Sequence, residues 1–253
     1  MGERTSHPAG TFSWAELATS DANAAKAYYS SLFGWEYDDN PIGDGQVYSM
    51  ARRDGKHVAA LFSSDQPPHW NCYVTVASAD EAAARAGELG GTVTAEAFDV
   101  MDAGRMAVIA DPAGAALCLW EARRNPGAGL VNTPGSMTWN DLTTPDAEAA
   151  ARFYGELFGW TFEEMPDAGG YQVISNGERI NGGIMPLDSE STGTPPSWMP
   201  YFGHDDVERL VQDGGGPGGR VHTGPIHMPQ GTVAVLGDPQ GAVFAVWTGE
   251  YDD

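Results

Sequence analysis

The sequence has few basic residues: 13 lysines and arginines stand against 35 aspartates and glutamates, which gives a net charge of −22 over 253 residues. A charge of this sign and size repels nucleic-acid backbones and anionic membrane surfaces, so we expect neither as a partner. No apolar run approaches the roughly 18 residues that a membrane span needs, and residues 1–12 lack the apolar core of a secretory signal. These absences predict a soluble, cytoplasmic protein.

Cysteine is also scarce. The two cysteines, Cys72 and Cys118, both lie in apolar, strand-like runs, and the second half of the chain carries Pro200 and Ala245 where we align them. This excludes a disulfide framework shared by the two halves. We therefore expect two buried, reduced thiols that pack as small hydrophobic side chains.

A long internal repeat organises the chain. Residues 12–37 recur without a gap as residues 137–162, with 12 of 26 positions identical. Such a repeat indicates a duplication into homologous halves, each of about 120 residues and long enough to close its own core. We expect domains at residues 11–121 and 136–249, joined by a linker at 122–135 that is rich in proline and glycine.

The same order of secondary-structure signals recurs in each half. Alternating apolar residues predict strands, and apolar residues spaced by three and four predict helices. In the first half the pattern predicts strands at 11–19, 47–50, 58–62 and 70–76 and helices at 21–33 and 79–89. In the second half it predicts strands at 136–144, 171–175, 182–185 and 198–202. Asp-Pro-x-Gly turns at 111–114 and 238–241 connect the last two strands of each half. The pattern β-α-β-β-β therefore occurs twice in each half, which predicts an α+β fold.

Several short motifs resemble those of the vicinal oxygen chelate superfamily, which includes glyoxalase I, extradiol dioxygenases, and fosfomycin and bleomycin resistance proteins. They are Leu17 with Asp21, Tyr28-Tyr29, Leu32-Phe33-Gly34-Trp35, Asp111-Pro112-x-Gly114 and Trp120-Glu121. The doubled layout is similar to the tandem glyoxalase-like proteins of actinobacteria that are often labelled hydroxylases or antigens. The resemblance implies paired βαβββ modules that form incurved, cup-shaped sheets, four modules in two homologous domains, with a small molecule bound in the cup.

The resemblance also locates the positions where metal-binding members of the superfamily carry their ligands, and this chain departs from the pattern at each. The three positions hold Trp14, Asn71 and Cys118 in the first half and Trp139, Met199 and Ala245 in the second. We therefore expect no metal and no cofactor, because an open catalytic site needs about three protein ligands. A non-family metal site at His69, on the same strand face as Asn71, or in a loop around His222 and His227 stays open.

Strand alternation predicts what lines the cups instead. Trp14 shares a face with Glu16, and Trp139 shares a face with Asp141. The predicted ligand-binding residues are Trp14, His69, Asn71, Tyr73, Cys118 and Trp120 in the first half and Trp139, Met199, Tyr201 and Trp247 in the second. Aromatic walls suit an apolar or heteroaromatic small molecule; the alternative is that these tryptophans pack in a core.

Glu16 and Asp141 are the candidate catalytic residues, because a carboxylate buried beside an indole has a raised pKa and can serve as a general base. The alternative is that each carboxylate only orients its strand through hydrogen bonds. The interpretation we favour is a metal-free small-molecule-binding protein, a monomer or homodimer, that acts in sequestration, resistance or an accessory step of secondary metabolism. The alternatives are a glyoxalase-like lyase or isomerase or an oxygenase, and a protein-interaction module whose cups are filled.

Overall fold

The computed structural model describes residues 2–43, 45–187 and 193–251. Its first half contains β1 (Phe12–Thr19), α1 (Ala22–Phe33), β2 (Glu36–Gly43), β3 (Gln46–Arg53), β4 (Lys56–Ser63), β5 (His69–Thr75), α2 (Ala79–Glu88), β6 (Thr92–Val100), β7 (Gly104–Ala110) and β8 (Ala116–Ala122). Its second half contains β9 (Met137–Thr144), α3 (Ala147–Phe158), β10 (Thr161–Glu164), β11 (Gln172–Asn176), β12 (Arg179–Pro186), β13 (Ser197–Gly203), α4 (Val207–Gln212), β14 (Arg220–Met228), β15 (Gly231–Gly237) and β16 (Val243–Gly249).

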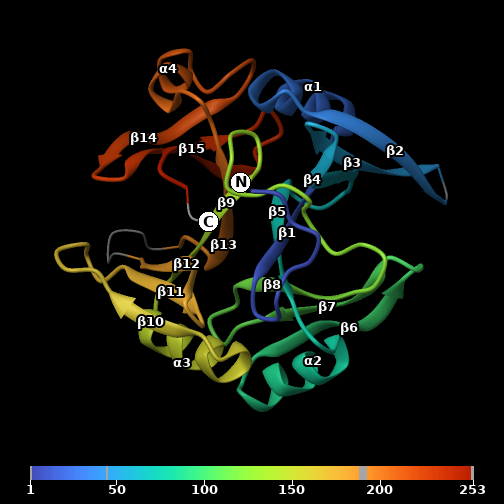
Figure 1. Cartoon of the computed structure of the whole chain (residues 1–253), viewed down its shortest axis with the longest axis vertical. Helices are drawn as coiled ribbons and strands as arrows, with labels where there is room; N and C mark the ends of the chain where they lie inside the picture. The colour runs from blue at the N-terminus through green and yellow to red at the C-terminus, as the bar shows by residue number, and fades with distance from the viewer. Residues whose placement is uncertain (1, 44, 188–192, 252–253) are drawn as a thin grey trace.

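Each half forms one eight-stranded sheet, and the two sheets have the same strand order. The first runs β2-β3-β4-β1-β5-β8-β7-β6 and the second β10-β11-β12-β9-β13-β16-β15-β14. The first strand of each module pairs in parallel with the last, as β1 does with β4 and β5 does with β8. This confirms the predicted α+β fold of four βαβββ modules. Figure 1 shows the first sheet at the right and the second at the left, with α1 and α4 at the top and α2 and α3 at the bottom.

Local signals place α1 and α2 where the sequence predicts them, whereas the short helix α4 was not predicted. The side chain of Asp21 accepts a hydrogen bond from the backbone of Ala24 at the start of α1, and Gly34 ends that helix in the left-handed conformation, with φ of 66°. Asp146 and Gly159 do the same for α3. The strands extend beyond the predicted ranges, and β2 was not predicted at all, because its exposed, acidic residues carry no apolar alternation. In the described ranges no helix is long and apolar enough to cross a membrane.

The core is shared by the two halves, so the expectation that each half closes its own core is wrong. Central strands of the two sheets meet directly: the rings of Trp70 in β5 and Phe202 in β13 lie 5.0 Å apart. The helices extend this contact, since the ring centroids of Tyr29 in α1 and Phe244 in β16 lie 5.4 Å apart. One continuous cluster of buried side chains therefore runs through both halves, because the helices of one half supply apolar cover for the sheet of the other.

The two Asp-Pro-x-Gly turns join the halves. One oxygen of Asp111 accepts hydrogen bonds from the three backbone N–H groups that follow Pro112. Its other oxygen accepts from the hydroxyl of Tyr154, on α3 of the opposite half, at 3.3 Å. Asp238 makes the equivalent turn and accepts from Tyr29 at 3.0 Å. A motif that the sequence explains as a turn thus also anchors a helix of the other half.

The segment at residues 122–135 covers the first sheet. The backbone of Ala128 donates to the carbonyl of Ser13 at 2.8 Å, and that of Gly129 donates to His57 at 2.8 Å. Ala128 and Val131 are buried in one small cluster with Trp14 and Trp120. The middle of the predicted linker is therefore packed against the concave face of the first sheet, in addition to joining the two halves of the chain.

Candidate functional site

A buried carboxylate held by three aromatic donors lies on the concave face of the second sheet, which we call the second cup. Asp141, on β9, is 5% exposed. One of its oxygens accepts hydrogen bonds from the indole N–H of Trp139 and the hydroxyl of Tyr171, each at 2.8 Å. The other oxygen accepts from the hydroxyl of Tyr201 at 2.5 Å. Each donor comes from a different strand or strand end, so the sheet itself sets the geometry.

The concave face of the first sheet, the first cup, repeats this arrangement with small changes. Glu16, on β1, accepts hydrogen bonds from Tyr48 at 2.7 Å and from Tyr73 at 3.0 Å. The indole of Trp14 donates to the hydroxyl of Tyr48 at 3.3 Å and not to the carboxylate. Both halves therefore place one acid between two tyrosines beside a tryptophan.

Burial controls the protonation of these groups. It raises the pKa of Asp141, while the hydrogen bonds from Tyr201, Tyr171 and Trp139 oppose that rise. Burial raises the pKa of Glu16 as well, again against hydrogen bonds from its tyrosines. Burial and then the adjacent carboxylate raise the pKa of Tyr201 well above its ordinary range. The phenols therefore stay protonated and act as donors, and each acid is a carboxyl group with an elevated proton affinity.

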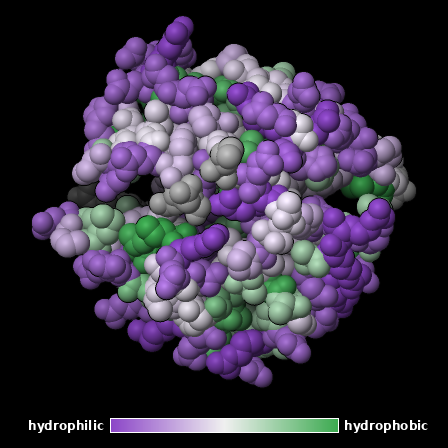
Figure 2. Space-filling view, in the orientation of Figure 1, coloured by the Kyte–Doolittle hydropathy of each residue, from purple (hydrophilic) through white to green (hydrophobic). Residues whose placement is uncertain are grey.

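The two cups differ in access. In the first, Trp14 is 4% exposed, and Tyr73, Cys118 and Trp120 are buried as well, packed with the covering segment. In the second, four aromatic side chains are all partly exposed: Trp139, Tyr171, Tyr201 and Trp247. Figure 2 shows a mostly hydrophilic surface with a hollow at the left, between the two arms of the second sheet, and another at the right, between the arms of the first, so the two cups differ in the exposure of their aromatic walls and not in outline. A ligand can therefore reach the aromatic residues of the second cup more easily.

Apolar side chains surround the aromatic residues of the second cup. Cross-strand partners point to the same face of a sheet, so Met185, which pairs with Thr143, shares the concave face with Asp141. Val243 lies on that face with Ala245 and Trp247 by alternation along β16. The same reasoning adds Ile226 and Met228 of β14. These four side chains are more than 40% exposed, which leaves apolar surface open to a ligand.

The other predicted site residues fall near these groups. Asn71 pairs with Glu16, and Met199 pairs with Asp141, so both face their cups. His69 lies on the same face of β5, and its Nδ1 is 2.8 Å from the carbonyl oxygen of Pro67.

The prediction of a loop at His222 and His227 is wrong. Both histidines lie within β14, where Nδ1 of His227 is 3.2 Å from the hydroxyl of Thr232. The alternating pattern of this strand is interrupted by glycine and proline, which explains the error.

Tyr48 and Tyr171 were missed by the sequence analysis. They occupy matched places in the two halves, 123 residues apart, each on or next to the third strand of its module. Reading the repeat beyond its first 26 positions would have paired them.

The donor set does not fit the superfamily's divalent ion. The first cup offers Glu16, Asn71 and Cys118, and burial raises the pKa of that thiol far above neutrality. The second cup offers Asp141, with Met199 and Ala245 at the remaining positions. Nowhere in residues 2–43, 45–187 and 193–251 do three or more histidine, cysteine, aspartate or glutamate side chains gather so as to hold a metal.

Comparisons with known proteins agree with this geometry. Residues 14–120 match the family described as "Glyoxalase-like domain", and residues 137–177 match "Bleomycin resistance protein-like N-terminal". A Mycobacterium tuberculosis protein named as a glyoxylase, CFP32, is 42% identical over 256 residues, which cover 97% of each chain. The chain belongs to the glyoxalase-like family of the vicinal oxygen chelate superfamily.

This glyoxalase-like chain is also 30% identical to the anthracycline biosynthesis protein DauV of Streptomyces sp. strain C5, over 94% of this chain and 92% of that one. Among solved structures, the Mn(II)-bound glyoxalase of Novosphingobium aromaticivorans has a TM-score of 0.67 at 16% identity and covers all of this chain and 85% of its own. The 2,3-dioxygenase LapB of Pseudomonas sp. KL28 has a TM-score of 0.66 at 16% identity, over 96% and 94%. At such identities the structural likeness supports the fold alone.

Proposed function

We propose that the protein binds a planar, aromatic small molecule in the second cup, without the superfamily's metal. One observation carries this proposal: Trp139, Tyr171, Tyr201 and Trp247 are partly exposed around the carboxyl group of Asp141. In the first cup three of the four counterparts, Trp14, Tyr73 and Trp120, are buried in a cluster with Ala128 and Val131 of the covering segment, and the fourth, Tyr48, is partly exposed. Aromatic rings offer flat apolar surface and prefer offset or edge-to-face contacts with other rings. A few fixed polar groups then orient the ligand.

The names of the relatives favour a role in sequestration, resistance or an accessory step of secondary metabolism. The open cup belongs to the half that matches the bleomycin-resistance-like family. DauV is named for the biosynthesis of anthracyclines, whose fused rings are the kind of surface that the aromatic walls would accept. We place this activity in a cytoplasmic monomer or homodimer. A first cup covered by its own chain would then have a structural role.

A second candidate function is catalysis with Asp141 as a general base. The raised pKa of this carboxyl group favours it. Three donors already occupy the carboxyl oxygens, so a substrate proton would have to reach the one remaining acceptor position, on the oxygen that faces Tyr201. Turnover separates the two functions: a binding protein converts none of the compounds that it binds, whereas an enzyme of this kind converts one of them, and Asp141→Asn should abolish that conversion while the compound still binds.

The test of the binding proposal is a fluorescence titration with planar aromatic compounds, anthraquinones first. A ligand stacked on the second cup should quench tryptophan emission and saturate near one equivalent. Trp139→Phe and Trp247→Phe should each weaken binding by about 1–3 kcal/mol. Trp14→Phe is the matched control, at the equivalent position of the covered cup, and should leave affinity unchanged. Loss of binding in the Trp14 variant alone would refute the assignment to the second cup.

A further inference from the structure

Within the described residues, methionines face the second cup from three of its strands. Met185 on β12 pairs with Thr143, and Met199 on β13 pairs with Asp141. Cross-strand partners point to the same face of a sheet, and Thr143 is two residues beyond Asp141 on β9, so both methionines lie on the concave face that carries the acid. Met185 is 41% exposed, and Met199 is partly exposed.

The third methionine, Met228, lies on β14, in the opposite arm of the second sheet (Figure 1). It pairs with Gly231, which in turn pairs with Gly249, two residues beyond Trp247. A Cβ on Gly231 would lie 2.6 Å from the indole of Trp247, so that ring covers the cross-strand partner of Met228. Met228 is 43% exposed. Oxidisable sulfur therefore flanks the aromatic residues of the second cup on both arms.

The first cup is built differently at these places. The positions that match Met185, Met199 and Met228 in strand register hold Phe62, Asn71 and Val100. Met50 and Met106, which pack against the buried cluster of the first cup, are less exposed. Among the described strands, highly exposed methionine on a concave face thus belongs to the second cup.

Hydrogen peroxide converts an exposed thioether into a sulfoxide. A sulfur lone pair attacks one peroxide oxygen, and the O–O bond breaks as the S–O bond forms. The other oxygen takes the proton of the transferred oxygen and leaves as water, so the sulfur is oxidised by two electrons and the peroxide is reduced by two. The product is polar and chiral where the methionine was apolar and flexible, and methionine sulfoxide reductases reverse the change, one enzyme for each epimer.

The aromatic residues of the second cup have already used their polar hydrogens. Three of them donate to the carboxyl group of Asp141, and the indole of Trp247 donates to the carbonyl of Glu250 at 3.0 Å. A sulfoxide oxygen beside them would therefore stay bonded to water, and a planar ligand that covered it would have to remove that water. A thioether sulfur, by contrast, makes favourable contacts with aromatic rings.

We propose that Met185 and Met228 are sites of reversible oxidation by peroxide, and that their sulfoxides lower the affinity of the second cup for its aromatic ligand. This inference rests on the binding function proposed above and adds its regulation: the reduced cup binds the ligand and the oxidised cup releases it.

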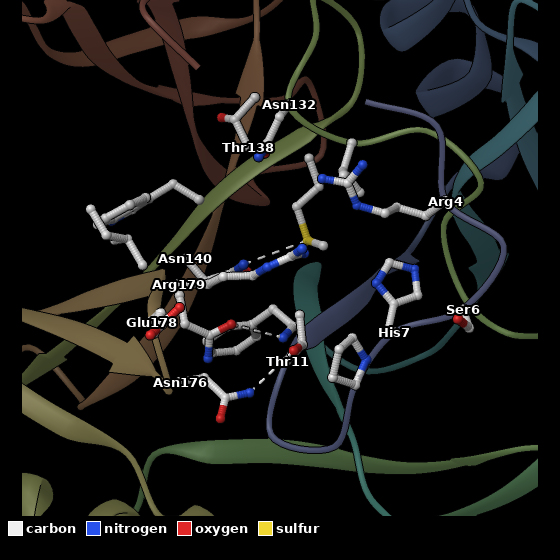
Figure 3. A pocket seen from close by; sticks show the side chains of 17 residues that line it. Arg4, Ser6, His7, Thr11, Asn132, Thr138, Asn140, Asn176, Glu178 and Arg179 are labelled. Carbon is white, nitrogen blue, oxygen red and sulfur yellow. Dashed lines mark hydrogen bonds between the residues drawn. The ribbon is translucent and has the colours of Figure 1, made fainter. Parts of the chain in front are cut away.

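Met137 supplies an internal reference for the oxidation. This side chain is 4% exposed, and its sulfur accepts a hydrogen bond from the amide of Asn140 at 3.5 Å, drawn as a dashed line in Figure 3. Peroxide that leaves the fold intact should therefore spare Met137. Met101, in the turn after β6, is 73% exposed and is the opposite reference, since it should be oxidised readily.

Fluorescence titration of the full-length protein with alizarin, a dihydroxyanthraquinone, before and after peroxide treatment tests the proposal. Peptide mass spectrometry identifies the oxidised residues, and circular dichroism checks the fold. The treated protein should carry sulfoxide at Met185 and Met228 but not at Met137, and it should bind alizarin about tenfold or more weakly. Incubation with both methionine sulfoxide reductases should restore the affinity. Equal affinity of the reduced and oxidised protein would overturn the proposal.

Leucine variants assign the effect to the two side chains. Leucine is close to methionine in volume and carries no sulfur, so the double variant Met185→Leu/Met228→Leu should keep its own starting affinity within about twofold after peroxide. Met101→Leu is the matched control, because it removes an exposed methionine outside the second cup, and it should lose affinity on oxidation as the wild type does. A double variant that lost as much affinity as the wild type would contradict the proposal.

The untreated protein separates this inference from the function on which it rests. If neither alizarin nor any other planar compound gave saturable quenching before oxidation, the binding function would be refuted, and its regulation with it. Saturable binding that peroxide does not weaken would refute the regulation alone.

Discussion

The indole N–H of Trp139 donates a hydrogen bond to the carboxyl group of Asp141, 2.8 Å away and two residues along the same strand. In the first half the acid is a glutamate, one methylene longer, and the indole of Trp14 bonds to Tyr48 instead. The duplicated site has thus kept its acid, its two tyrosines and the bond from the indole to a tyrosine, since Trp139 also donates to the hydroxyl of Tyr171 at 3.1 Å. The second half adds a bond from the indole to the acid. Asp141 thus has the indole of Trp139 as its third polar partner, whereas Glu16 has the side chain of Asn71 in addition to its two tyrosines.

The first prediction concerns Asp141→Asn and pH. Burial raises the pKa of this carboxyl group in the folded state above its ordinary value of 3.8. At pH values between 3.8 and the folded-state pKa, the folded state therefore binds more protons than the unfolded state. The contribution of Asp141 to stability is then full below about pH 4 and falls as pH rises through the folded pKa. Asparagine does not titrate. The free energy of unfolding of the variant, relative to wild type, should therefore increase from pH 4 towards neutral pH.

Denaturant unfolding at a series of pH values measures this difference. Glu16→Gln should show the same direction, because burial also raises the pKa of Glu16. Asp65→Asn, on an exposed loop, serves as the control for a general charge effect. A difference for Asp141→Asn that shrinks as pH rises would contradict the assignment of a raised pKa.

The fold was largely predictable because its signals are local and repeated. The helix from Asp21 to Gly34 carries its own start and stop residues, and the copy 125 residues later repeats them. The acids and tryptophans of the cups followed from alternation along a strand. These features depend on neighbours within a few residues, which a sequence displays directly.

The contacts between the halves could not be predicted in this way. Nothing near Tyr29 indicates that its hydroxyl bonds to Asp238, because the two are 209 residues apart and meet only when α1 packs on the other sheet. The covering of the first cup by Ala128 was also hidden, since a segment rich in proline and glycine has no periodicity that indicates burial. Access to each cup, which distinguishes the two sites, depends on these long-range contacts.

The second prediction concerns the tyrosines that join the halves. Tyr29→Phe removes the hydroxyl that donates to Asp238 and accepts from the indole of Trp70 at 3.1 Å. Two buried polar groups lose a partner, so the variant should be destabilised by about 1–3 kcal/mol. Tyr154→Phe should behave alike, because it breaks the equivalent bonds to Asp111 and Trp198.

Tyr37→Phe is the matched control, because the hydroxyl of Tyr37 is buried without a hydrogen-bond partner among the described residues. This variant should be as stable as wild type or more stable. Since the core is continuous, every variant should still unfold in a single transition by calorimetry. Two separate transitions, with Tyr29→Phe affecting one of them, would show that the halves are independent.

The third prediction tests the covering of the first cup. Gly127 has φ of 108°, and a Cβ there would lie 2.6 Å from the carbonyl oxygen of Ser13. Gly127→Ala should therefore destabilise the protein by about 1–3 kcal/mol. Gly114→Ala is the matched control, since its φ is 104° but the nearest atom lies 3.9 Å from the added Cβ. The Gly114→Ala variant measures the cost of backbone strain alone. If both variants lost the same free energy of unfolding, residues 127–128 would not be packed tightly against β1.

The fourth prediction concerns metal content. Indole and thioether side chains at Trp14, Trp139 and Met199 are not ligands for the hard divalent ions that suit carboxylate and imidazole sites. The remaining acids, Glu16 and Asp141, are each bonded to two tyrosines, so binding a cation would require breaking those hydrogen bonds as well as recruiting further ligands. Elemental analysis of purified protein should find far less than one Zn, Ni, Mn or Fe per half, before and after incubation with each ion and gel filtration. The contrary result would be one equivalent of metal ion per half that survives mild chelation and is lost in Glu16→Gln or Asp141→Asn. It would show that the cups bind a metal through a ligand set unlike that of the superfamily.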